Sequence, residues 1–191
     1  LRDFSSARSM SSSTFIFIEE KTKEILLKMI NWKDWKNWAA LALPIGSGYL
    51  ASSLSGMDSS AGEVVIARPP SWVFATVWPI LYLLIGFAWV LLRNMRDSPR
   101  GGFSGNLWGF KEIDLLFLLN VTGLVSWIVV YAHNDDKKGA VYVLLVTFVL
   151  ALVTFMYAFM ISARVAYMLA PYVGWLLFAM MMNFEEVNYL G

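Results

Sequence analysis

The sequence predicts an all-α integral membrane protein, built as a single bundle of five transmembrane helices. Hydrophobic residues make up 58% of the 191 residues and the mean hydropathy is +0.58, which excludes an ordinary soluble domain. The apolar residues fall in five runs of membrane-spanning length, separated by short polar segments. The runs lack the period-two alternation of a transmembrane β-barrel, so helices are the expected spanning structure.

An N-terminal arm, residues 1–37, is expected to precede the membrane domain, residues 38–191. Residues 1–14 are rich in Ser and Arg, which is typical of a targeting-peptide remnant, with a processed N-terminus and a disordered tail as alternatives. Between residues 25 and 38, apolar and Lys residues recur at helical spacing. This pattern predicts an amphipathic helix lying at the membrane interface.

The five predicted spans each contain close to the twenty residues that cross a bilayer as a helix. They cover residues 38–54, 71–92, 113–133, 139–161 and 165–182. Pro69 and Pro70 stand directly before the second span, where their fixed φ and missing N–H groups suit a helix start. Acidic side chains near the ends of other spans are expected at the interface or in water. These are Asp114, beside Lys111, and Glu185 and Glu186.

The distribution of basic residues predicts how the chain is oriented in the membrane. With the five spans in place, every Lys and Arg except Arg68, Lys137 and Lys138 falls on the side of the N-terminal arm. By the positive-inside rule, the N-terminus faces the cytoplasm, or the matrix in a mitochondrial membrane. The location expected for this multi-pass protein is the mitochondrial inner membrane or another organellar membrane, and the charge distribution does not choose between them.

The composition excludes several classes of function. The absence of cysteine rules out disulfides, thiolate nucleophiles and Cys-ligated metal or iron–sulfur sites. A net charge of +1 gives no reason to expect a nucleic acid partner. The single histidine, His133, adjoins Asn134 and Asp135 and is expected to be solvated, so no metal site is predicted. No residue pattern indicates a hydrolytic or redox centre, so no catalytic residue is predicted.

Three motifs occur in order along the predicted spans. The first begins Pro69-Pro70-x-Trp72-Val73-Phe74 and continues Val77-Trp78-x-x-Leu81-Tyr82-x-x-x-Gly86; the second is Leu118-Leu119-Asn120; the third is Pro171-Tyr172-x-x-Trp175-x-x-Phe178-Ala179-x-x-x-Asn183. Together they resemble the translocator protein, or tryptophan-rich sensory protein, family (TspO/MBR). In that family the first motif opens the second of five transmembrane helices, in agreement with the spans predicted here.

The resemblance implies a ligand-binding function. Members of the family enclose a pocket that binds porphyrins, tetrapyrrole degradation products and synthetic apolar ligands, with no required cofactor. Carried over to this chain, the ligand-binding residues are Trp78, Asn120, Trp175, Ala179 and Asn183. Facing indole rings are suited to a flat aromatic macrocycle, with a few polar groups to orient it. Light-dependent porphyrin breakdown in bacterial members, linked to the tryptophans matched by Trp78 and Trp175, implies photochemistry rather than acid–base catalysis.

Departures from the family pattern support a second hypothesis. Residues 64–68 replace the family's usual segment before the double proline, and Gly123 stands where Trp is common. The arm has no recognised counterpart. On this second hypothesis, the chain is a structural accessory subunit of a larger membrane complex, in mitochondria or elsewhere, and keeps the fold without the ligand function. The expected partners are the lipid bilayer, a small apolar ligand, and either a second copy or a larger complex reached through the arm.

Overall fold

The computed structural model describes residues 30, 32–56, 65–66, 68–96, 106–107 and 110–190. Most of the predicted arm, residues 1–37, lies outside the described residues, and so does most of the segment predicted to form an interfacial helix. Both therefore stay predictions.

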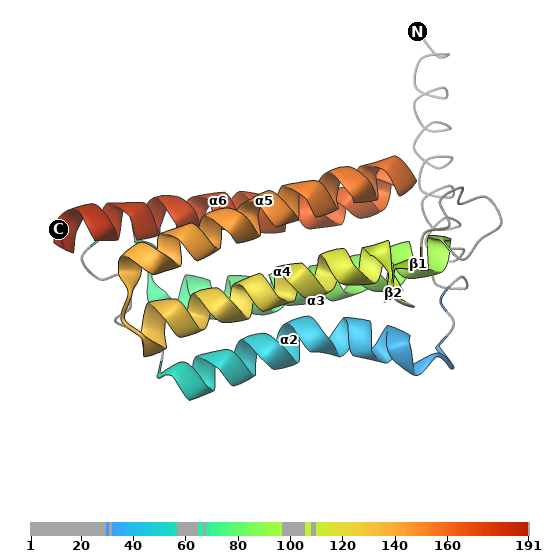
Figure 1. Cartoon of the computed structure of the whole chain (residues 1–191), viewed down its shortest axis with the longest axis horizontal. Helices are drawn as coiled ribbons and strands as arrows, with labels where there is room; N and C mark the ends of the chain where they lie inside the picture. Colours follow the sequence, from blue (N-terminus) through green and yellow to red (C-terminus); the bar gives the residue numbers. More distant parts are fainter. Residues whose placement is uncertain are drawn as a thin grey trace, which may run out of the picture.

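The described residues form five long helices and one short hairpin. The helices are α2 (Trp35–Ser55), α3 (Ser71–Arg96), α4 (Glu112–Ile128), α5 (Lys137–Ile161) and α6 (Ala163–Leu190). A π-helical turn, η1 (Val129–His133), extends α4, and β1 (Asn106–Leu107) pairs antiparallel with β2 (Phe110–Lys111). The helices run side by side along the long axis of the molecule (Figure 1). The predicted helical bundle is confirmed.

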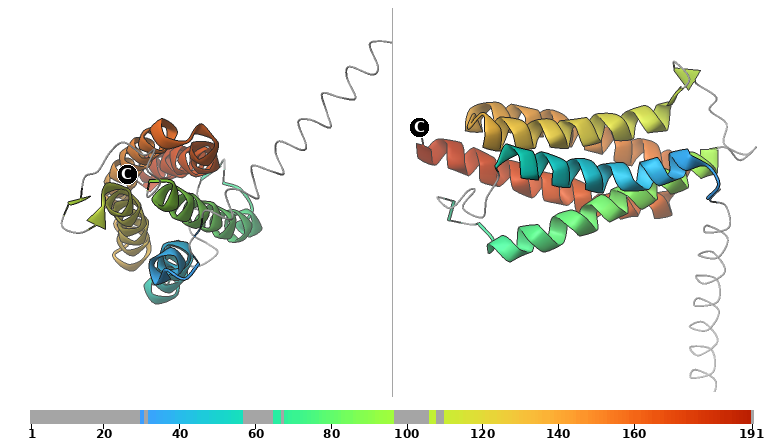
Figure 2. Two further views of the ribbon diagram at one scale, coloured as in Figure 1. Left: turned by 90° about the vertical axis from the view of Figure 1, so that its right-hand side faces the viewer. Right: turned by 90° about the horizontal axis from the view of Figure 1, so that it is seen from below.

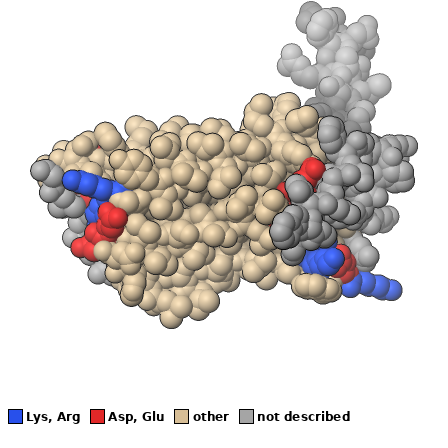
Figure 3. Space-filling model, viewed as in Figure 1, with Lys and Arg blue, Asp and Glu red and all other residues tan. Residues whose placement is uncertain are grey.

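Four of these helices are long and apolar enough to cross a membrane: α3, α4 with η1, α5 and α6. The predicted first span, residues 38–54, is helical, but α2 is not among these candidates. Gly, Ser and Asn interrupt its apolar residues, which lowers its hydropathy. In Figure 3 the charged side chains gather near the two ends of the visible face, and an uncharged band separates them. That distribution is typical of a membrane-embedded bundle.

The helices follow one another around the bundle in the order α2, α3, α6, α5, α4, and α4 closes the ring against α2. The end-on view in Figure 2 shows this arrangement, with α2 at one side and α5 and α6 at the other. Because α3 and α6 are neighbours although far apart in sequence, the first and third motifs are brought together.

Glycine allows α2 and α3 to pack closely. A Cβ at Gly86 would lie 2.8 Å from the backbone oxygen of Leu41, and one at Gly48 would lie 2.5 Å from the ring of Tyr82. At Gly46, by contrast, no atom lies within 4 Å of such a Cβ. Gly48 and Gly86 are therefore needed for the close approach of the two helices, and Gly46 is not.

A buried ion pair lies at the end of the bundle where α3 ends and α4 begins. Asp114, only 4% exposed, accepts hydrogen bonds from Arg93 Nη1 at 2.6 Å and from Trp89 Nε1 at 2.7 Å. Asp114 was expected at the interface beside Lys111, but its side chain is buried within the bundle and pairs with Arg93. Arg93 compensates its charge and Trp89 satisfies its second oxygen, which removes most of the cost of burial.

Candidate functional site

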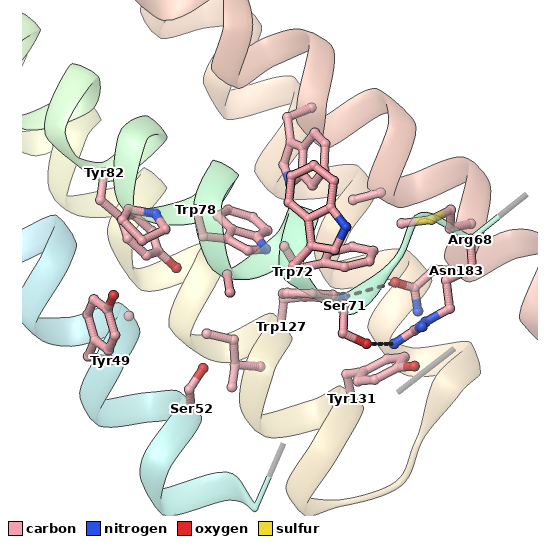
Figure 4. A pocket seen from close by; sticks show the side chains of 18 of the residues that line it. Tyr49, Ser52, Arg68, Ser71, Trp72, Trp78, Tyr82, Trp127, Tyr131 and Asn183 are labelled. Atoms are coloured by element: carbon pink, nitrogen blue, oxygen red, sulfur yellow. Dashed lines mark hydrogen bonds between the residues drawn. The ribbon is translucent and has the colours of Figure 1, made fainter. Parts of the chain in front are cut away.

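A cavity of about 570 Å³ opens between α2, α3, α6 and the junction of α4 with η1. It lies toward the end of the bundle where α2 ends and α3 begins, opposite the buried Asp114. Its lining is mainly aromatic and apolar, with a small number of polar side chains (Figure 4). The aromatic residues of the lining are Tyr49, Trp72, Phe74, Trp78, Tyr82, Trp127, Tyr131 and Trp175.

Trp78 is the centre of the aromatic lining. Its ring centroid lies 5.5 Å from that of Tyr82, one turn along α3, and the two rings are stacked. The centroid of Trp127 on α4 is 6.0 Å away, and that of Trp175 on α6 is 6.3 Å away. Offset and edge-to-face contacts at these distances stabilise aromatic pairs beyond the area that they bury. The rings therefore form one connected wall contributed by three helices.

The two predicted tryptophans contact each other edge to face. The planes of Trp78 and Trp175 meet at 87°, so a flat molecule can lie parallel to only one of them. This geometry differs from the expected pair of facing indoles. Phe74, whose ring lies 5.8 Å from that of Trp175, packs against Trp175 from α3.

Two buried donors on α6 have no hydrogen-bond partner among the described residues: Trp175 Nε1 and Asn183 Nδ2. Both residues line the cavity. A buried N–H group without a partner costs free energy on the order of a lost hydrogen bond, about 1–3 kcal/mol. The pairing is completed if a molecule in the cavity supplies acceptor atoms.

Polar side chains of α6 and of the α4–η1 segment pair at one end of the cavity. Trp127 Nε1 donates to Asn183 Oδ1 at 3.2 Å. One turn further along both segments, the Tyr131 hydroxyl donates to the Glu186 carboxylate, at 3.0 Å from Oε1 and 2.9 Å from Oε2. Glu186 is 5% exposed, so its expected place in solvent was wrong. Both contacts fix polar atoms at the cavity wall.

The π-helical turn η1 and Lys137 hold Tyr131 in position. Lys137 Nζ donates to the Tyr131 carbonyl oxygen at 2.9 Å and lies 3.7 Å from the centre of the Tyr131 ring. It also forms an ion pair with Asp135 at 2.9 Å. Single π-helical turns are frequent at functional sites because they redirect side chains of an otherwise regular helix. Here the turn contains a residue that lines the cavity.

The segment before α3 supplies a cation to the lining. Arg68 Nη2 donates to Ser71 Oγ at 3.3 Å, and the Arg68 guanidinium carbon lies 5.6 Å from the centre of the Phe74 ring. Figure 4 shows Arg68 on the same side of the cavity as Tyr131 and Asn183. Positive charge is thus present on the side of the cavity where Tyr131 and Asn183 lie.

Comparison with known proteins shows the family of this chain. The TspO/MBR family model matches residues 40–188, which include α3, α4, α5, most of α2 and nearly all of α6. The chain belongs to the TspO/MBR family. It is also 22% identical over 139 residues to the tryptophan-rich protein TspO of Archaeoglobus fulgidus, a match that covers 73% of this chain and 83% of that protein. Membership in this family agrees with a multi-pass membrane protein.

The TspO/MBR motifs meet at the cavity, with one exception. Trp78, Trp175, Ala179 and Asn183 all line it, whereas Asn120 does not. The Asn120 amide donates to Leu116 O at 2.9 Å and to Thr154 Oγ1 at 2.8 Å, and its oxygen accepts from the Tyr172 hydroxyl at 3.2 Å. The structure thus brings four predicted residues together and gives Asn120 partners on α5 and α6. Their roles in ligand binding remain predictions.

Several lining residues were not predicted from the TspO/MBR motifs. Trp127, Tyr131 and Glu186 belong to no motif quoted above, although each lines the cavity. Trp127 and Tyr131 are four residues apart in sequence, and so share a helix face with each other. That spacing was the sequence feature that could have predicted both as neighbours in the cavity wall. The signal for Glu186 was its spacing of three from Asn183, which places both on one face of α6.

Proposed function

We propose that this TspO/MBR protein binds a flat, largely apolar aromatic small molecule of the porphyrin or tetrapyrrole class in the cavity between α2, α3, α4 and α6. The observation that carries the proposal is the connected wall of Trp78, Trp127 and Trp175 around a cavity of about 570 Å³. This volume falls within the range of about 300–1,000 Å³ that is typical of small-molecule sites. No cofactor is required for binding alone.

The polar atoms of the lining support the proposal. Trp175 Nε1, which has no partner within the described chain, is a donor suited to a carbonyl or carboxylate oxygen. Arg68 adds positive charge to the cavity. A tetrapyrrole offers both a flat conjugated surface for the indole rings and acidic side chains for these donors.

The direct test is a titration with protoporphyrin IX. Binding is measured by the Soret absorbance of the porphyrin, so the signal does not depend on the number of tryptophans. The Trp78→Phe/Trp175→Phe double variant is expected to bind about tenfold more weakly, because it loses indole area at two positions of the aromatic wall and the Trp175 N–H. Trp35→Phe/Trp38→Phe is the matched control, since both of these tryptophans are exposed near the start of α2.

Equal affinities of the two double variants would overturn the proposed site. The alternative, an accessory subunit that retains the fold without a ligand, predicts that the wild type binds no porphyrin. It also predicts migration on a native gel with other proteins rather than alone or as a dimer. Mass spectrometry of the natively purified protein identifies co-purifying proteins and small molecules in one measurement.

The proposed orientation places the cavity in the half of the membrane away from the arm. The positive-inside rule assigns the start of α2 to the cytoplasmic or matrix side. The cavity lies near the opposite ends of the helices, where Ser52, Arg68 and Glu186 are found. A ligand then reaches the site from the external side or laterally from the lipid. We propose an organellar membrane, with the mitochondrial inner membrane as the first to examine.

A further inference from the structure

Asn183 and Glu186, called the polar pair below, lie next to each other in the wall of the cavity. Both are on α6 at a spacing of three residues, which places them on one face of the helix with Cβ atoms about 5–6 Å apart. They are 4% and 5% exposed, respectively. A buried amide and a buried carboxylate are therefore side by side in a lining that is otherwise mostly aromatic and apolar.

The contact with Trp127 determines which way the Asn183 amide points. An indole N–H can only donate, so its partner at 3.2 Å must be the oxygen of the amide. The Asn183 Nδ2 group is then directed elsewhere, and no atom of the described residues accepts from it. Asn183 thus offers donors, and Trp127 prevents the amide from turning over.

Glu186 offers an acceptor. The Tyr131 hydroxyl, its donor partner, is shared between the two carboxylate oxygens at 3.0 and 2.9 Å. A carboxylate has about four acceptor positions, so one hydroxyl leaves most of them unused. A carboxylate buried in a membrane bundle is costly, and such residues commonly serve a site. Lys137 fixes Tyr131 through its carbonyl and ring, and so keeps the acceptor in place.

We infer that the polar pair recognises a lactam edge, the neighbouring C=O and N–H groups of a cyclic secondary amide, at one end of a conjugated ligand. The lactam carbonyl accepts from Asn183 Nδ2, and the lactam N–H donates to the Glu186 carboxylate. This inference rests on the proposed function and narrows it. A closed porphyrin directs its N–H groups to the centre of the ring and cannot form this pair, whereas an open-chain tetrapyrrole carries a lactam at each end.

The test compares biliverdin with protoporphyrin IX, because both contain four pyrrole-type rings and two propionates but only biliverdin ends in lactams. Wild type is expected to bind biliverdin about tenfold more tightly than protoporphyrin IX. The reason is that a lactam pairs with the Asn183 amide and the Glu186 carboxylate, which otherwise keep unused hydrogen-bonding positions. The variants are Asn183→Asp, which keeps the oxygen for Trp127 and removes the donor, and Glu186→Gln, which replaces one acceptor oxygen with a donor. Glu185→Gln is the matched control, since Glu185 is outside the lining.

Loss of the biliverdin preference in both variants, with the preference retained in Glu185→Gln, supports the inference. Two variants are used because one of them could fail to fold. A thermal unfolding curve shows whether each variant is folded. If wild type binds both ligands equally, or if both variants keep the preference, the lactam site is wrong while the proposed function stands. If wild type binds neither ligand, the proposed function fails as well.

Discussion

Asn120 shows at the scale of one residue how the bundle is held together. Its side chain bonds to the Leu116 carbonyl, to Thr154 on α5 and to Tyr172 on α6. It is 2% exposed, so water does not replace these partners. Polar side chains inside a membrane bundle are satisfied in this way by neighbouring helices. The contacts of Asn120 favour a structural role over the predicted contact with a ligand.

Replacing Asn120 tests that role. Asn120→Ala is expected to lower the free energy of unfolding by about 1–2 kcal/mol, because Tyr172 and Thr154 lose a shared partner. The affinity for protoporphyrin IX is expected to change much less. Thr122→Ala, at an exposed position of the same helix, is the control. Thermal unfolding in detergent measures the first effect, and a large loss of affinity without loss of stability would contradict the structural role.

The ion pair of Arg93 and Asp114 leads to a second prediction. Arg93→Met leaves the buried carboxylate of Asp114 without its cation, which is expected to destabilise the fold by about 3–5 kcal/mol. Adding Asp114→Asn removes the charge and keeps an oxygen for Trp89, so the double variant is expected to recover part of the loss. Denaturation in detergent measures both, and a double variant less stable than Arg93→Met would contradict a charge effect.

Sequence reasoning placed two acidic residues wrongly for one physical reason. Asp114 was expected at the membrane interface and Glu186 in water, because acidic side chains are seldom buried without a partner. Their partners are Arg93 and Tyr131, separated from them in sequence by 21 and 55 residues. Local patterns carry no information about contacts at that separation. By contrast, Trp78 and Trp175, which the family motifs single out, both line the cavity although they are far apart in sequence.

At the scale of the elements, helix positions could be read well from the sequence. The predicted spans of residues 71–92 and 139–161 correspond to α3 and α5, and α3 begins at Ser71 directly after the double proline. The last helix was predicted to end at residue 182 but continues to Leu190. The difference has the same origin as the misplacement of Glu186, since the acidic residues were taken as the end of the span. The π-helical turn η1 was not predicted, because no residue pattern in the sequence indicated it.

The packing of α2 against α3 gives a third prediction. Gly86→Ala is expected to destabilise the fold by about 1–3 kcal/mol, because the added Cβ meets the backbone oxygen of Leu41, which cannot move away as a side chain can. Gly46→Ala is the matched control on the partner helix, where nothing lies within 4 Å of the added atom. It is expected to be neutral or to stabilise by about 0.5–1 kcal/mol, since Ala favours helix. Equal melting temperatures for the two variants would contradict the close approach.

At the scale of the whole molecule, α2 differs from the other long helices in its relation to the membrane. It packs against α3 and α4, two of the four helices that are apolar enough to span, yet it is not itself such a candidate. Exposed Trp35 and Trp38 near Lys33 and Lys36 are typical of a helix end at the membrane interface. We therefore expect α2 to cross the bilayer together with its neighbours.

Because the chain has no cysteine, single cysteines report topology directly. In sealed vesicles, a membrane-impermeant maleimide is expected to label Lys36→Cys from the cytoplasmic or matrix side and Lys138→Cys from the opposite side. Both positions are exposed, and they lie near opposite ends of the helices. If both cysteines were labelled from the same side, either α2 does not span the membrane or the helices do not cross it along the long axis of the bundle.

The proposed function requires that the ligand occupies the cavity between α2, α3, α4 and α6, so filling that cavity with a larger side chain is the sharpest test of it. Ala179 is 4% exposed and lines the cavity, whereas Ala170 on the same helix is exposed and outside the lining. The measurement is the dissociation constant of protoporphyrin IX for Ala179→Phe and Ala170→Phe, with thermal unfolding as the check on folding. We expect at least about tenfold weaker binding for Ala179→Phe alone, because the new ring occupies the ligand's space. Wild-type affinity in a folded Ala179→Phe would contradict it.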